Sequence, residues 1–115
     1  MMHFFDKFKD ISIFSSRIYK YIIYEDSDTV FIDVFFELIY PRNKYIKVTF
    51  KDVKEYSIYW NCNYYHSYVE DVKYVQKENL HYISFDPNQE VNTISEKDQN
   101  FILCSNIEID YLSNK

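Results

Sequence analysis

The strictest pattern of apolar and polar positions lies in residues 30–40. Every even position there is apolar, from Val30 to Tyr40, and the odd positions include Asp33 and Glu37. A period of two places alternate side chains on opposite faces of a strand. This segment therefore predicts a long strand with one buried face, ended by turn residues at 41–43.

The same alternation, with β-branched and aromatic residues, predicts further strands on both sides of this segment. Turn-forming residues separate them at 25–28, 51–52 and 86–90. Residues 68–76 fit a helix as well as a strand, but they contain neither Ala nor Leu, which favours a strand. The other predicted strands cover residues 19–25, 45–50, 56–60, 80–85, 101–104 and 107–112.

Two segments predict short helices. The apolar residues between positions 4 and 11 follow a helical spacing. Ser95 followed by Glu96 and Asp98 is typical of a helix start, here of one or two turns. About seven closely spaced strands predict one mainly β domain over residues 1–115. We expect an antiparallel meander that forms a curved sheet, a sandwich or a partly open barrel, with one or two short helices.

The chain contains neither glycine nor alanine. This excludes the familiar glycine-rich phosphate loops and the nucleophile elbow. Oxyanion holes commonly use closely approached backbone N–H groups, which small residues allow. We therefore expect no enzyme activity and no catalytic residues. Backbone positions with positive φ must fall to Asn and Asp, which tolerate them better than other side chains.

The net charge of −5 is unevenly placed along the sequence. Residues 1–60 carry nine acids and nine bases, whereas residues 61–115 carry nine acids and four bases. Nucleic-acid binding requires clustered Lys and Arg, so the pattern argues against a nucleic acid as partner. An acidic half favours a basic protein partner. A solvated acidic face without any partner would give the same pattern.

The histidines and cysteines do not predict a metal site or a cofactor. His3, His66 and His81 have no zinc-site spacing to one another. Cys62 lies four residues before His66, but two further ligands would have to come from elsewhere. Cys62 and Cys104 are expected to be free thiols that pack as apolar residues in a reducing compartment.

No apolar run is long enough to span a bilayer. Residues 1–9 lack the basic-then-apolar order of a signal peptide. We therefore expect a cytoplasmic protein with no membrane partner.

A polar and aromatic segment follows the predicted strand at 56–60. Trp60, Tyr64 and Tyr65 lie in it, and the acids Glu70 and Asp71 come soon after. Tyr, Trp and Asn give rigid amphipathic contacts and are favoured at interfaces. The segment fits a protein-binding edge, a sugar-binding patch or an aromatic corner of the core.

Three stretches in the C-terminal third carry a resemblance to a known class of protein. They are residues 82–87 (YISFDP), 95–102 (SEKDQNFI) and 107–109 (IEI). These stretches resemble small bacterial immunity proteins of polymorphic toxin or contact-dependent growth inhibition systems, which are encoded beside toxin genes. The resemblance implies a protein that binds the nuclease or other effector domain of its cognate toxin and blocks it.

The sequence thus predicts an immunity protein that occludes a basic toxin domain through acidic side chains and aromatic anchors. The alternative is a small carbohydrate- or ligand-binding β module that stacks its ligand on the same aromatic rings. Exposed strand edges would allow a homodimer as well as a monomer. The predicted toxin-binding residues are Trp60, Tyr64, Tyr65, Glu70, Asp71, Glu90, Glu96 and Asp98.

Overall fold

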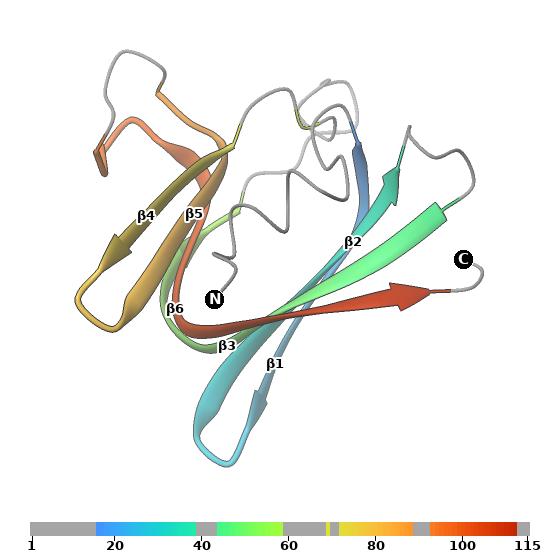
Figure 1. The fold of residues 1–115 in the computed structure, drawn as a ribbon. Coiled ribbons are helices and arrows are strands. Elements are labelled where there is room, and N and C mark those ends of the chain that lie inside the picture. Colours follow the sequence, from blue (N-terminus) through green and yellow to red (C-terminus); the bar gives the residue numbers. More distant parts are fainter. Residues whose placement is uncertain (1–15, 39–43, 59–68, 70–71, 89–92, 113–115) are drawn as a thin grey trace.

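The computed structural model of the chain describes residues 16–38, 44–58, 69, 72–88 and 93–112. No described residue lies in a helix, and none therefore belongs to a helix that could cross a membrane. The predicted mainly β class is confirmed (Figure 1). The described residues form six strands: β1 (Arg17–Asp26), β2 (Thr29–Leu38), β3 (Lys44–Ser57), β4 (Lys73–Lys77), β5 (Leu80–Asp86) and β6 (Gln99–Leu112).

The strands form one antiparallel, curved sheet. Their order is β1-β2-β3-β6-β5-β4, so β1 and β4 occupy the two edges. Strands β1 to β3 form one meander and β4 to β6 form a second. The two meanders are joined where β3 pairs with β6 rather than with β4. The sheet therefore differs from a single meander at this one junction.

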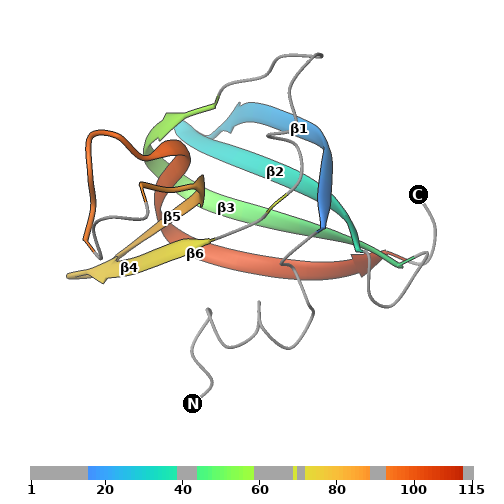
Figure 2. The same ribbon diagram turned by 90° about the horizontal axis from the view of Figure 1, so that it is seen from above.

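The two central strands are the longest, with fourteen residues each, and they curve along their length (Figure 2). Asp52 has a φ of 55°, and the pairing of β3 with β6 shifts register between Val53 and Glu55. Such a bulge bends a strand without ending it. The predicted turn at 51–52 and the predicted break between residues 104 and 107 are therefore wrong, because β3 and β6 each continue through them.

The core lies on the concave face of the curved sheet. The alternation predicted for β2 is confirmed, because Ile32, Val34 and Phe36 are each 0% exposed. The ring of Phe36 lies 5.5 Å from the ring of Phe85 on β5, and the ring of Phe50 on β3 lies 6.3 Å from it. Since β5 pairs with neither β2 nor β3, curvature brings the β4–β5 hairpin over this face.

Positive φ angles fall mostly where the lack of glycine predicts them. Among the described residues, Asp28, Asp52 and Asn100 have φ of 64°, 55° and 49°. Ser27 and Glu78 are the exceptions, with φ of 53° and 56°. Both lie in two-residue turns, one between β1 and β2 and one between β4 and β5. These turn positions normally favour Gly, Asn or Asp.

Other predicted elements are either confirmed or lie outside the described residues. The strands predicted at 19–25 and 80–85 are confirmed as parts of β1 and β5, and residues 73–76 of the ambiguous segment are part of β4. The helix predicted over residues 4–11 and the turn at 41–43 lie outside the described residues.

Candidate functional site

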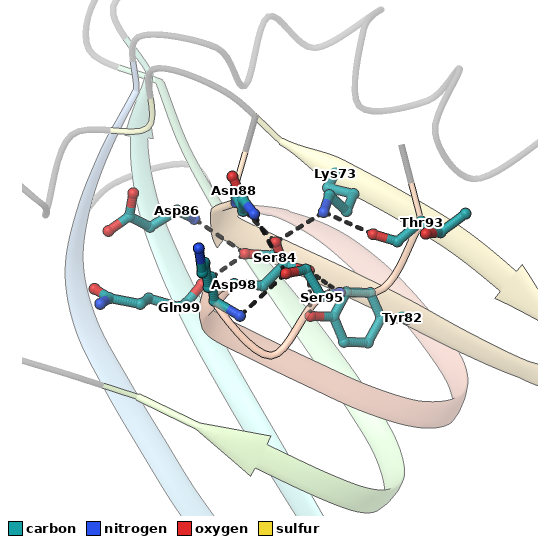
Figure 3. A network of polar contacts seen from close by, with 10 residues as sticks. Lys73, Tyr82, Ser84, Asp86, Asn88, Thr93, Ser95, Asp98 and Gln99 are labelled. Carbon is teal, nitrogen blue, oxygen red and sulfur yellow. Dashed lines mark hydrogen bonds and ion pairs between the residues drawn. The ribbon is translucent and has the colours of Figure 1, made fainter. Parts of the chain in front are cut away.

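One buried carboxylate organises the end of the sheet formed by β4, β5 and β6. Asp98 directly precedes β6, and its side chain is 0% exposed. Its Oδ1 accepts hydrogen bonds from Lys73 Nζ at 2.8 Å and from the Asn88 backbone N–H at 2.7 Å. Its Oδ2 accepts from the Tyr82 hydroxyl at 2.8 Å and the Ser95 backbone N–H at 3.0 Å (Figure 3). We call these five residues the Asp98 cluster.

Strands position the two side-chain donors of the cluster. Lys73 is the first residue of β4 and pairs with Ser84 of β5, two positions from Tyr82. Residues two apart in a strand share a face, so Lys73 and Tyr82 reach the same carboxylate. The Tyr82 ring stacks on Phe101 of β6, with centroids 5.4 Å apart. Lys73 Nζ also donates to the backbone carbonyl of Thr93 at 2.8 Å.

The 93–98 loop contains a single turn in place of the predicted short helix. The Ser95 Oγ accepts a hydrogen bond from the Lys97 N–H at 3.1 Å, and the Asp98 N–H donates to the Ser95 carbonyl at 3.1 Å. With the bond from the Ser95 N–H to the Asp98 carboxylate, this resembles a capping box. The predicted helix is nevertheless wrong, because Gln99 already begins β6 and leaves no room for a helical turn to propagate.

The electrostatics of the cluster favour the ionised carboxylate. Burial acts to raise the pKa of Asp98, but the hydrogen bonds from Lys73, Asn88, Ser95 and Tyr82 outweigh it and hold this pKa below its usual value. Burial, followed by the bond to Asp98, raises the pKa of the Tyr82 hydroxyl. A buried ion pair is tolerated when hydrogen bonds satisfy the remaining lone pairs. That condition is met here, because Asp98 accepts four hydrogen bonds and Lys73 Nζ also donates to the Thr93 carbonyl.

The hydrogen-bond count shows what this arrangement can do chemically. An ionised carboxylate offers about four lone-pair sites, and Asp98 uses its two oxygens for four hydrogen bonds. No acceptor site remains to take a proton from a substrate. The cluster therefore holds chain segments together, and its geometry does not suit Asp98 to general-base catalysis.

Of the eight predicted site residues, the structure describes Glu96 and Asp98, and the two differ in exposure. Glu96 is exposed in the turn of the 93–98 loop, as a surface contact requires. Asp98 was predicted as an acidic contact but lies in the interior, because its carboxylate is enclosed by its own hydrogen-bond donors. Six predicted residues lie outside the described part of the chain: Trp60, Tyr64, Tyr65, Glu70, Asp71 and Glu90.

Three members of the Asp98 cluster are close in sequence to the predicted acidic contacts Glu70, Asp71, Glu90 and Glu96. The sequence alone did not reveal Lys73 or Tyr82 as partners of Asp98, because they lie 25 and 16 residues away along the chain. The three members that neighbour predicted acids in the sequence are Lys73 (after Glu70 and Asp71), Asn88 (before Glu90) and Ser95 (before Glu96).

The acids of the described residues divide into paired and unpaired groups. On β6, Glu108 and Asp110 form ion pairs with Lys51 and Lys47 of β3, at 2.5 and 3.9 Å. Lysines of the first half of the sequence thus neutralise acids of the second half, which a charge count along the sequence does not show. Among the described residues, the exposed acids outside every ion pair are Glu25, Asp26, Asp28, Glu55, Glu78, Asp86 and Glu96.

Two of the remaining candidate groups for metal chemistry lie among the described residues. His81 Nδ1 is hydrogen-bonded to the Tyr74 hydroxyl at 2.5 Å. Cys104 is a free, buried thiol, as predicted, and burial raises its pKa to about 12. Within the described ranges, no group of three or more His, Cys, Asp or Glu side chains could hold a metal ion. The predicted weak pair of Cys62 and His66 lies outside these ranges.

Comparison with known proteins adds no relative to this picture. No family model, no curated protein and no solved structure matches the chain. The interpretation of the site therefore rests on its own geometry.

Proposed function

We propose that this chain is an immunity protein that binds a basic bacterial toxin domain in the cytoplasm and neutralises it by occlusion. One observation carries the proposal. The Asp98 cluster fixes the chain beside Glu96 and beside the sequence positions of Glu70, Asp71 and Glu90, which are the predicted acidic contacts. Asp98 itself acts from the interior, where its carboxylate binds Ser95, the residue before Glu96.

A fixed loop favours binding for an entropic reason. Fixing the backbone of one residue costs about 1–2 kcal/mol, and a loop that becomes ordered only on binding loses this free energy from its affinity. Because the Ser95 N–H and the Thr93 carbonyl are already bound inside the free protein, less of this cost remains when a partner binds. Glu96, exposed on the same loop, is free to attract a cationic surface and to speed encounter.

The partner implied by this chemistry carries clustered Lys and Arg. A toxin domain that acts on a phosphate-bearing substrate needs such a cluster for its own activity. An acidic surface that covers it blocks the substrate by occupying the same charges. The predicted aromatic residues Trp60, Tyr64 and Tyr65 would supply buried anchors, since Trp and Tyr dominate binding energy at interfaces.

The test begins with the gene immediately upstream. The C-terminal domain of its product is expressed in bacteria with and without this chain, and growth is measured. We expect growth arrest without the chain, rescue with it, and a stoichiometric complex in size-exclusion chromatography. A non-toxic upstream product, or a toxic one that this chain neither binds nor neutralises, would refute the proposal.

A matched pair of variants then locates the contact. Glu96→Gln removes one exposed charge from the 93–98 loop. Asp28→Asn removes one from the turn between β1 and β2, at the other edge of the sheet. We expect Glu96→Gln to weaken toxin binding by up to about fivefold and to reduce its salt dependence, as for a charge at the rim of an interface. Asp28→Asn should leave both unchanged. Equal effects of the two variants on toxin binding would show that the 93–98 loop is not the contact.

A further inference from the structure

The edge strand β1 exposes an unusual run of apolar side chains. Six large hydrophobic residues are exposed among the described residues, and three of them are consecutive in β1: Ile22 at 37%, Ile23 at 44% and Tyr24 at 39%. Single exposed apolar residues are ordinary. A continuous run on an edge strand is different, because the unpaired backbone of an edge is a template for another strand.

The turn that follows β1 determines which backbone groups face outwards. Asp26 pairs with Thr29 across a two-residue turn with positive φ at both central positions. Residues that flank such a turn direct their N–H and C=O groups at each other. Because backbone groups alternate in direction along a strand, the N–H and C=O groups of every second residue of β1 point away from β2. The backbone groups on the outer edge are those of Tyr21, Ile23 and Glu25.

The charges along β1 are arranged with opposite signs at its two ends. Lys20 lies at the start of the regular part, just after the bulge between Ile18 and Lys20, and Asp26 lies at the end. Lys20, Ile22, Tyr24 and Asp26 share one face of the sheet because they alternate along the strand. An antiparallel strand that fits this edge needs an acid at one end, apolar residues at its centre and a base at the other. The strand β1 itself has this pattern.

We infer that a second copy of this chain pairs with β1, antiparallel and about a twofold axis at Ile23, to join two sheets into one. In this register Ile23 of one copy lies opposite Ile23 of the other and exchanges backbone hydrogen bonds with it. Ile22 lies opposite Tyr24, and Lys20 lies opposite Asp26. Both of the latter are non-hydrogen-bonded pairs, whose side chains approach most closely.

Neighbouring registers fit less well. A shift of one pair places Asp26 opposite Ile22 in one direction and beyond the bulge, level with Ile18, in the other. In either case Lys20 and Asp26 no longer lie opposite each other. The chosen register also uses side chains that the single copy already holds in place. Tyr24 stacks on Phe31 with centroids 5.3 Å apart, and the Lys20 ammonium lies 4.9 Å from the centroid of the Phe35 ring.

The surface is separate from the proposed toxin contact. β1 forms one edge of the sheet, whereas the Asp98 cluster uses Lys73 of β4, the other edge strand, and Tyr82 of β5 beside it. Pairing of two copies through β1 therefore leaves both 93–98 loops exposed. The dimer would present two toxin-binding surfaces, and disruption of one contact should leave the other intact.

The first test is the mass of the whole chain by sedimentation velocity across micromolar to submillimolar concentrations. We expect a concentration-dependent dimer. Ile23→Lys brings two cations together at the twofold axis and should give a monomer with an unchanged circular dichroism spectrum. Ile94→Lys changes an equally exposed residue (41%) in the 93–98 loop and should remain dimeric. A monomeric wild-type chain, or a dimer that survives Ile23→Lys, would overturn the inference.

A charge exchange tests the register itself. Lys20→Glu and Asp26→Lys each place like charges opposite each other twice in the dimer and should each weaken dimerisation by about tenfold. The double variant restores opposite charges and should recover most of the loss. Absence of recovery would refute this register, whereas recovery would require Lys20 and Asp26 to face each other between copies. Neutralisation of the toxin should persist in Ile23→Lys, so that failure of one proposal is distinguishable from failure of the other.

Discussion

The β1–β2 and β4–β5 hairpins have the same local plan and opposite surroundings. Each turns through two residues, the first of which has a positive φ: Ser27 in one and Glu78 in the other. The β1–β2 hairpin leaves apolar side chains and acids such as Asp26 on its surface. The β4–β5 hairpin contributes Lys73 and Tyr82 to a buried polar cluster.

The difference shows that the role of an acid depends on its donors rather than on its position in an acidic stretch. Asp98 accepts four hydrogen bonds and stabilises the chain around it. Asp26 accepts a hydrogen bond from the Ser27 hydroxyl at 3.3 Å and forms no ion pair with a described residue, so its charge remains available to a partner. Substitutions in the two hairpins should therefore differ in their effects on folding and on association.

The largest expected effect is that of Asp98→Ala. It leaves the Lys73 ammonium buried without its counter-ion, which typically costs about 3–5 kcal/mol. Asp26→Ala, the matched change in the β1–β2 hairpin, should alter the free energy of unfolding by less than about 0.5 kcal/mol. Urea denaturation of each monomer, at a concentration below dimerisation, measures both values. Equal losses would contradict the assigned difference between the two acids.

Removal of single tyrosine hydroxyls should change the free energy of unfolding less, and by different amounts in the two hairpins. Tyr82→Phe removes a hydrogen bond of 2.8 Å to a buried carboxylate, and bonds to charged groups contribute about 1.5–3 kcal/mol. Tyr24→Phe removes a longer contact of 3.5 Å to Asp33 and should cost less than about 0.5 kcal/mol. The comparison uses thermal and urea unfolding, and a larger loss for Tyr24→Phe would reverse our interpretation of the hairpins.

Acid should destabilise the β4–β5 side through Asp98. Its pKa is lower in the folded chain than in the unfolded chain, so the unfolded state binds the proton more tightly. The contribution is complete above the unfolded value of about 3.9 and is lost as pH falls through the lower folded value. Unfolding free energies measured from pH 7 to pH 2 should fall more steeply for the wild type than for Asp98→Asn. Parallel curves would show that Asp98 does not carry this dependence.

The smallest expected effect is a gain in stability at the two turns. A left-handed backbone costs about 1–2 kcal/mol in a residue other than glycine, and the extra freedom of glycine in the unfolded chain offsets about 0.4–1 kcal/mol of this. Ser27→Gly and Glu78→Gly should therefore each stabilise the fold by about 0.5–1 kcal/mol. Asn79→Gly, beside Glu78 but outside the positive-φ set, should bring no gain in urea unfolding.

Alternation along the sequence was sufficient to predict the strands but not their limits. In β2 the even positions from Ile32 to Leu38 are buried as expected, because one residue of slip would turn the whole apolar set outwards. Lys51 and Asp52 were interpreted as a turn because a bulge needs the same residue type with positive φ. Only the register of β3 against β6 shows that the strand continues through them.

The candidate site was predicted less well, for a physical reason. The spacing of Ser95 and Asp98 predicted a helix start, and the structure keeps only the local contact between these two residues, without the helix. The burial of Asp98 could not be predicted, because it depends on Lys73 and Tyr82, which pairing of β4, β5 and β6 brings to it. The sequence pattern of Asp98 does not distinguish it from Asp110, which is partly exposed beside Lys47.

The enclosed thiol of Cys104 makes the native fold resistant to alkylation. A pKa of about 12 leaves on the order of one thiolate in ten thousand at pH 8. Reaction with a thiol reagent thus requires the centre of β6 to open first. In a Cys62→Ser background, the labelling rate of Cys104 would report how often the two meanders separate, without any added probe.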